Sequence, residues 1–172
     1  MSFKPYTYRT ERLPIRKAGE ILQIAGSFYE IREVRITRQQ ITLTAGVSDQ
    51  TLNVATSSTY EPIVGNIKKS RVVHLQYLAC STTDAVYLKW QENPLLSRAA
   101  NLPLNSNLAN LESPYEVNKW SYDDSMCLKY SLAAGLSQTL TIEAIEYFVA
   151  PYKGTPEKYL EITADGEAVF HG

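Results

Sequence analysis

The chain has 172 residues, of which 44% are hydrophobic and 20% charged, and its formal net charge at pH 7 is −1. This length suits one globular domain that can bury a core without a disulfide framework or a metal. The near-neutral charge gives no field that favours nucleic acid or a membrane surface, so neither is expected as a partner. The sequence has no signal-peptide core and no run near the roughly 20 apolar residues of a membrane-spanning helix, which predicts synthesis in a cytoplasm.

The charged residues are unevenly distributed along the chain. Residues 1–40 contain eight Lys or Arg against four Asp or Glu, whereas residues 141–172 contain two against six. Either this asymmetry is incidental on a solvated surface, or the oppositely charged segments face each other, within one fold or between subunits.

Residues 1–19 are basic and contain two prolines, which disfavour helix in the residues before them. A solvated tail has no need of aromatic rings, and this segment has three. We therefore expect an extended arm that docks on a partner, with a disordered tail as the alternative. The residues of the arm expected to make contacts are Phe3, Tyr6, Tyr8, Arg9 and Arg12.

From residue 19 onward, short apolar runs separated by turn residues indicate β-strands. The apolar phase changes within the second run, which predicts a β-bulge near Arg32 and Glu33. Gly46 lies in a predicted turn after the third run. The strands predicted in this part of the chain cover residues 20–24, 28–36, 40–44 and 51–54.

Residues 71–80 have the most regular strand pattern of the sequence, with Val73, Leu75 and Tyr77 on one face. A polar loop of four residues separates them from a second alternating run at residues 85–90. A loop of this length is typical of hairpins. The pattern therefore predicts that residues 71–90 form an antiparallel hairpin.

Residues 91–121 break the strand pattern with three prolines, and six asparagines fall within residues 93–118. Six irregularly spaced leucines argue against disorder, so we expect an ordered loop excursion that packs on its own domain or on a neighbour. One helical turn is possible at residues 106–111, capped by Ser106 or Asn107. The leucines expected to make partner contacts are Leu102, Leu104, Leu108 and Leu111.

Strand patterns resume at residues 126–130 and 138–149, and the second of these again changes its apolar phase. Two short strands at 159–163 and 168–170 flank an Asp-Gly pair, which is a hairpin signal. Regular short strands with turns between them predict an all-β fold. We expect one antiparallel, jelly-roll-like β-sandwich or barrel over residues 20–172, with an arm at 1–19 and a loop insertion at 91–121.

The sequence contains no recognisable catalytic or metal-binding motif. His74 and His171 are the only histidines, and neither has a metal ligand at a known motif spacing. Cys80 and Cys127 lie in apolar runs typical of buried thiols, with a disulfide as the alternative. We expect no enzyme, no metal and no cofactor.

One aromatic and acidic cluster supports a different interpretation. Trp120, Tyr122, Asp123 and Asp124 could contact a glycan or an ion, because carboxylates beside aromatic rings occur in sugar sites. The same residues also form an ordinary turn pattern.

The order of elements in the first half of the chain resembles the small β-sandwich structural proteins of tailed-phage virions, such as head decoration (cement) and fibre-associated proteins. The residues that carry this resemblance are EILQI at 20–24, the turn at Gly26, the strand that begins at Phe28, RVVHLQYL at 71–78 and AVYLKW at 85–90.

The resemblance extends over roughly residues 12–90 and involves no diagnostic motif. It implies a non-enzymatic virion protein that works as a homo-oligomer and stabilises the phage head through arm and loop contacts. The implied partners are the major capsid protein or other virion proteins. The alternative is a tail- or fibre-associated module that binds carbohydrate.

Overall fold

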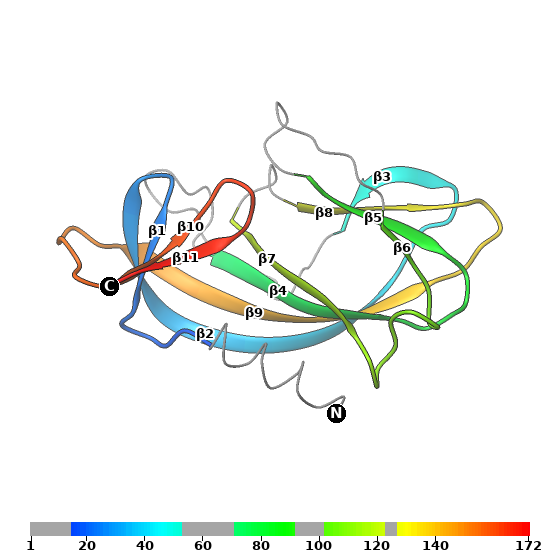
Figure 1. The fold of residues 1–172 in the computed structure, drawn as a ribbon, viewed down its shortest axis with the longest axis horizontal. Coiled ribbons are helices and arrows are strands. Elements are labelled where there is room, and N and C mark those ends of the chain that lie inside the picture. Colours follow the sequence, from blue (N-terminus) through cyan, green and yellow to red (C-terminus); the bar gives the residue numbers. More distant parts are fainter. Residues whose placement is uncertain (1–14, 53–70, 92–101, 123–126) are drawn as a thin grey trace.

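The protein is described by a computed structural model that defines residues 15–52, 71–91, 102–122 and 127–172 (Figure 1). These residues form β-strands and turns and contain no helix. The strands are β1 (Ile21–Ile24), β2 (Ser27–Thr42), β3 (Val47–Thr51), β4 (Arg71–Cys80), β5 (Val86–Gln91), β6 (Leu102–Leu104), β7 (Tyr115–Ser121), β8 (Cys127–Leu132), β9 (Thr139–Pro151), β10 (Tyr159–Ile162) and β11 (Ala168–His171).

The strands form two sheets, which confirms the prediction of an all-β sandwich. The larger sheet has the order β11-β10-β1-β2-β9-β4-β7, and the smaller has the order β3-β8-β5-β6. Neighbouring strands are antiparallel except for β1 and β10, which run parallel with Leu22 opposite Leu160. Figure 1 shows the smaller sheet beside the group of β1, β10 and β11, with the long strands β2 and β9 running past both.

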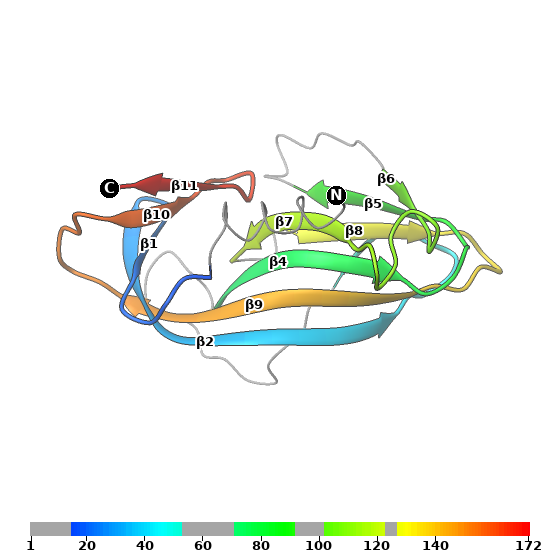
Figure 2. The same ribbon diagram turned by 60° about the horizontal axis from the view of Figure 1, so that its bottom comes forward.

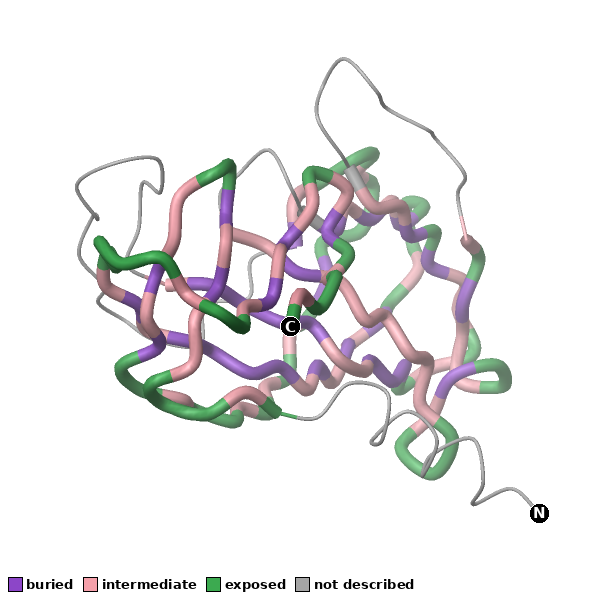
Figure 3. The backbone as a smooth tube through the Cα atoms, turned by 60° about the vertical axis from the view of Figure 1, so that its left-hand side comes forward, coloured by how far each residue is buried: buried purple, intermediate pink, exposed green. Residues whose placement is uncertain are grey.

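The phase change predicted within β9 separates two hydrophobic cores. Alternate residues of segment 140–144 pack in the core between the two sheets. Alternate residues of segment 145–149 pack in a second core with β1 and β10. The pairing of β9 with β2 continues without a shift through this point, so the two sets lie on opposite faces of the strand. Figure 3 shows how buried residues follow the long strands while exposed residues gather at the turns.

The predicted bulge in β2 is confirmed by a register shift between Ile31 and Glu33 against β9. The runs at residues 28–36 and 40–44 are one strand rather than two, because no glycine or proline interrupts them and pairing with β9 continues to Thr42. The strand predicted at 51–54 instead begins at Val47 and ends at Thr51.

The hairpin predicted over residues 71–90 is wrong. β4 pairs with β7 and β9 in the larger sheet, whereas β5 pairs with β6 and β8 in the smaller one. The polar loop between them therefore carries the chain from one sheet to the other. Loop length alone does not distinguish a turn within a sheet from a crossing between sheets.

Gln138 explains why that loop crosses. Its side chain is fully buried, and its Oε1 accepts hydrogen bonds from the backbone N–H groups of Ser81 (2.8 Å) and Thr82 (3.0 Å). Its Nε2 donates to the carbonyl oxygens of Thr82 (3.0 Å) and Asp84 (2.8 Å). Ser137 adds a bond from its N–H to the Asp84 carboxylate at 2.8 Å. The loop that joins β8 to β9 thus satisfies the backbone of the loop that joins β4 to β5.

Residues 102–121 are not a loop excursion throughout. Segment 102–104 is β6 of the smaller sheet, and segment 115–121 is β7 of the larger one. The short strand and the bulged pairing of β7 explain the weak sequence pattern. Segment 105–114 between these strands is a loop, as predicted, and residues 92–101 of the predicted insertion lie outside the described residues.

The Asp-Gly signal is confirmed by the hairpin of β10 and β11, whose tip reaches β7 (Figure 2). Trp120 donates its backbone N–H to the carbonyl oxygen of Gly166 at 2.8 Å. Gly166 has a φ of 82°, and a Cβ there would lie 2.8 Å from the Trp90 ring. Only glycine satisfies both the left-handed backbone and the close approach.

Candidate contact surface

The residues predicted to make arm contacts, Phe3, Tyr6, Tyr8, Arg9 and Arg12, lie outside the described residues, as do Asp123 and Asp124. Segment 15–19 of the predicted arm is described and is bound to the domain. The N–H of Arg16 donates to the hydroxyl of Tyr147 at 3.1 Å, and the N–H of Gly19 donates to the carbonyl of Ile31 at 2.8 Å. Residues 15–19 are therefore part of the folded domain rather than of a separate arm.

The four leucines predicted to contact a partner divide into two pairs. Leu102 is half-buried, and Leu104 is only 4% exposed in the core between the sheets, so both pack within their own domain. This corrects the prediction, because β6 turns alternate side chains inward. Leu108 and Leu111 are 65% and 61% exposed and remain available to a partner.

Two asparagines shape the loop that carries the exposed leucines. Oδ1 of Asn105 accepts hydrogen bonds from the N–H groups of Asn107 (3.0 Å) and Leu108 (3.3 Å), and caps a single helical turn. The predicted turn is thus present, but its cap is Asn105 instead of Ser106 or Asn107. Oδ1 of Asn110 accepts from the N–H of Glu112 at 3.0 Å in the next turn. The loop is therefore held in a defined conformation with its leucines outward.

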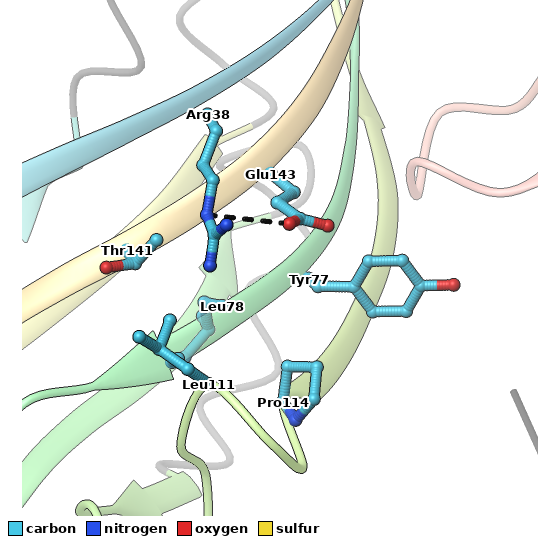
Figure 4. A pocket seen from close by; sticks show the side chains of 8 residues that line it. Arg38, Tyr77, Leu78, Leu111, Pro114, Thr141 and Glu143 are labelled. Atoms are coloured by element: carbon cyan, nitrogen blue, oxygen red, sulfur yellow. Dashed lines mark ion pairs between the residues drawn. The ribbon is translucent and has the colours of Figure 1, made fainter. Parts of the chain in front are cut away.

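Leu111 borders a shallow hollow of about 20 Å³ on the larger sheet (Figure 4). The hollow lies on the face opposite the smaller sheet, because Thr141 and Glu143 alternate with the core residues of β9. We call this region the Leu111 surface and define it by Arg38, Tyr77, Leu111, Pro114, Thr141 and Glu143.

An ion pair crosses the Leu111 surface between β2 and β9. Nε of Arg38 lies 3.6 Å from Oε1 of Glu143, and both side chains are largely exposed. Such a pair adds little to folding, at most about 1 kcal/mol, so both charges can be redirected to a partner. Arg38 belongs to the basic segment and Glu143 to the acidic one, and this contact confirms that the two segments face each other within one fold.

Ile36 extends the apolar character of this face. It lies two residues before Arg38 on β2, and its side chain is 67% exposed. Opposite Ile36 on β9 is Ile145, which is fully buried. A single exposed aliphatic side chain is ordinary on a protein surface, so Ile36 adds to this face but does not by itself mark a contact site.

Trp120, the central residue of the predicted glycan site, has a different environment. It is 2% exposed and packs in the second core, where its ring stacks on Tyr147 with centroids 5.3 Å apart. Tyr122 is half-buried and packs against the same core. The sequence pattern did not show that β7 turns Trp120 inward, and a buried indole offers no stacking platform to a sugar.

Two side chains that could serve as a base or a nucleophile, those of His74 and Cys80, are buried. Burial lowers the pKa of His74 to about 4, which keeps its imidazole neutral at physiological pH. Cys80 is a free buried thiol, as predicted, and burial raises its pKa to about 11. A side chain of this kind is a weak nucleophile at neutral pH.

Among the residues that the structure describes, no three His, Cys, Asp or Glu side chains are grouped so as to hold a metal ion. No helix in the same part of the chain has the length and hydropathy to span a membrane.

The sequence pattern did not predict Arg38, Tyr77 and Glu143 as surface residues or Gln138 and Glu146 as buried polar residues. Glu146 is fully buried, and its Oε2 lies 3.4 Å from Nη1 of Arg71. The charge asymmetry was the one available signal for Arg38 and Glu143. Nothing in the local sequence marks Gln138 or Glu146, because their burial depends on strands distant in the chain.

No protein-family model matches this chain, and no curated protein or solved structure resembles it at a significant level. The resemblance to phage virion proteins therefore stays a prediction.

Proposed function

We propose that the chain is a non-catalytic structural protein of a tailed-phage virion, of the capsid decoration class, and that it attaches through the loop of Leu108 and Leu111. The observation that carries this proposal is the exposure of both leucines on a loop fixed by Asn105 and Asn110. A rigid loop loses little conformational entropy on binding, so more of the contact energy becomes affinity.

The surroundings of the leucines suit a protein partner. The Leu111 surface combines aliphatic and aromatic groups at its centre with the exposed Arg38–Glu143 pair beside them. Protein interfaces have this composition, with an apolar centre and a polar rim. Full burial of each leucine contributes about 1.5–3 kcal/mol, which corresponds to roughly tenfold or more in affinity for each side chain.

The virion assignment rests on the resemblance of residues 12–90 and on a fold that offers an exposed contact surface while its His74 and Cys80 side chains are buried. A decoration protein that contacts the capsid through rigid loops and extended arms needs a stable sheet structure to hold them. The described core suits such a scaffold, since β9 packs one face in the core between the sheets along segment 140–144 and the opposite face in the second core along segment 145–149.

The test is co-sedimentation with phage particles assembled without this chain. We expect wild-type protein to bind and the double variant Leu108→Ser, Leu111→Ser to bind at least tenfold more weakly. Tyr87→Ser is the matched control, because Tyr87 is 46% exposed on the smaller sheet, away from the Leu111 surface. Equal binding by the double variant would remove the loop from the proposal.

A second experiment addresses the arm separately. We expect deletion of residues 1–12 to leave the domain folded with its thermal transition unchanged, because the described fold begins with segment 15–19 bound to Tyr147 and Ile31. We expect the shortened chain to lose particle binding. Unchanged binding, with particles equally resistant to heat, would limit the contact to the loop.

The carbohydrate-binding alternative has lost its main support, because Trp120 is part of the core. A glycan array provides the comparison. A specific hit would favour that alternative over the decoration role.

A further inference from the structure

β11 is the open edge of the larger sheet (Figure 2). The N–H of Thr163 donates to the carbonyl of Glu167 at 2.9 Å, which marks a hydrogen-bonded pair at the start of the hairpin. Pairs alternate along antiparallel strands, so Val169 also exchanges its hydrogen bonds with β10. The N–H and C=O groups of Ala168 and Phe170 then point away from β10, and within the part of the chain that the structure describes nothing pairs with them.

The other three sheet edges carry features that discourage pairing. β6 has Pro103 at its centre, which removes an N–H donor. β3 has a register shift against β8 and a φ of 54° at Asp49, both of which distort the edge of this strand. β7 has a register shift and a φ of 48° at Asn118, and its Trp120 N–H is already bonded to Gly166. Bulges, prolines and charges are the usual protection of edge strands.

β11 has none of these features. Its sequence is Ala-Val-Phe-His, and Val169 and Phe170 are 45% and 59% exposed. An apolar edge strand with outward backbone groups is a template for another strand. The contrast with the three protected edges indicates that this one is kept open for a partner.

We propose that β11 pairs antiparallel with β11 of a second copy of this chain, about a two-fold axis that passes between the two Val169 residues. In this register Ala168 of each copy lies opposite Phe170 of the other, and each such pair exchanges both of its backbone hydrogen bonds. Val169 faces its own counterpart in a non-hydrogen-bonded pair, where side chains approach most closely. The larger sheets of the two copies become one continuous sheet.

The strand is complementary to itself in this register, which is the reason for choosing a second copy as the partner. The large ring of Phe170 lies over the small side chain of Ala168, so the two rings do not collide. One residue further out, Glu167 lies opposite His171 of the other copy, and these two groups, which pair with Lys119 and Glu161 within their own chain, are of opposite charge when His171 is protonated. A two-fold interface requires this kind of matching of one surface to itself.

Position 169 provides a sharp test because it faces itself. We expect the wild-type chain to be dimeric by sedimentation velocity, and Val169→Lys and Val169→Glu alone to associate at least tenfold more weakly. Mixed in equal amounts, the two variants should form a heterodimer at least tenfold more tightly than either alone, because unlike charges then meet on the axis. Val169 is exposed, so both variants should keep the wild-type circular dichroism and unfolding midpoint.

A second pair of variants separates backbone from side-chain effects. Phe170→Ala and Phe170→Pro both remove the ring, but only proline also removes the outward N–H. That N–H makes no bond to β10, so the hairpin should survive in both. We expect Phe170→Pro to weaken association several-fold beyond Phe170→Ala.

Two results would overturn the proposal. One is a monomeric wild-type chain at about 0.1 mM, where a pair with micromolar Kd is dimeric. The other is a dimer that persists unchanged in Val169→Lys, since the contact then lies elsewhere. The proposal does not rest on the virion role, because particle binding is measured separately through the loop of Leu108 and Leu111.

Discussion

The imidazole of His74 stacks on the indole of Trp120, with ring centroids 4.2 Å apart and planes inclined by 7°. The stack is buried, and Nε2 of His74 donates to Oδ1 of Asn118 at 2.9 Å. Protonation of this imidazole would place a charge in the second core. Burial therefore lowers the pKa of His74 to about 4, although the Asn118 hydrogen bond partly opposes the shift and the charge of Arg16 adds to it.

This stack makes the stability of the fold depend on pH. The unfolded chain takes up a proton at His74 as the pH falls through 6.5, whereas the folded chain resists it until about pH 4. Above pH 6.5 the two states bind the same number of protons at this residue. Between pH 6.5 and 4 the free energy of unfolding should decrease by roughly 3 kcal/mol from this group, which urea denaturation at several pH values would measure.

His74→Gln isolates that effect, because an amide can still bond Asn118 but does not titrate. The variant should be less stable at pH 7.5 by about 1–2 kcal/mol through the lost ring stack. Its stability should then fall less steeply than wild type between pH 6.5 and 4. Gln40→Ala, a change at an exposed residue of β2 that does not titrate, is the control and should keep the wild-type slope. Parallel curves for wild type and His74→Gln would contradict the prediction.

Gln138 joins two loops that cross between the sheets, so its loss should be severe. Gln138→Ala would leave the N–H of Thr82 and the carbonyl of Asp84 without partners in a partly buried site, while the N–H of Ser81 would keep its bond to the carbonyl of Thr139. Each unsatisfied buried group costs about 1–3 kcal/mol, and we expect a total loss of at least about 3 kcal/mol in the free energy of unfolding.

Chemical denaturation provides that measurement, and Gln40→Ala is its control. Gln40 is exposed on β2, and its replacement should change stability by no more than about 0.5 kcal/mol. A similar small effect for Gln138→Ala would mean that water replaces the amide and that the crossing does not depend on it.

The sequence predicts the fold class because strand periodicity is a local property. The bulge in β2 and the phase change in β9 were both visible as slips in alternation, since side chains of a strand must face one side or the other. The sequence pattern did not show where the chain crosses from one sheet to the other. Whether residues 81–84 form a turn or a crossing depends on Gln138, which lies more than fifty residues later in the chain.

The candidate site shows the same contrast between local features, which the sequence predicts, and long-range contacts, which it does not. A leucine-rich, proline-broken segment indicates ordered contact residues, but it does not distinguish Leu104, which packs inward, from Leu108, which does not. That distinction depends on the pairing of β6 with β5, which is a long-range contact. The sequence predicts a surface position for Trp120 for the same reason, because an aromatic residue beside acidic residues has no local sign of burial.

The two leucines offer a direct comparison of stability. Leu104→Ala should cost about 2–5 kcal/mol, because it opens a cavity between the sheets. Leu108→Ala removes the same atoms from an exposed position and should change stability by about 0.5 kcal/mol or less. Thermal unfolding of both variants checks the prediction. Equal losses would mean that Leu108 is buried in the folded protein.

Arg71 and Glu146 form an ion pair in the interior, with Nη1 and Oε2 3.4 Å apart. The other carboxylate oxygen of Glu146 is buried without a hydrogen-bond partner. Arg71→Met should therefore cost about 3–5 kcal/mol, because it leaves a buried carboxylate without its cation. Arg32→Met is the control, since Arg32 pairs with Glu30 on the surface and its loss should cost about 1 kcal/mol or less.

The double variant Arg71→Met, Glu146→Gln separates the charge from the packing. Removing the carboxylate charge as well should restore more than half of the stability lost in Arg71→Met, because the penalty arises from the unpaired charge. Urea denaturation at pH 7.5 of the four members of this cycle gives the coupling energy directly. If the double variant were less stable than Arg71→Met, Glu146 would stabilise the fold through contacts that do not involve Arg71, and the pair would not be the unit that makes this carboxylate tolerable in the core.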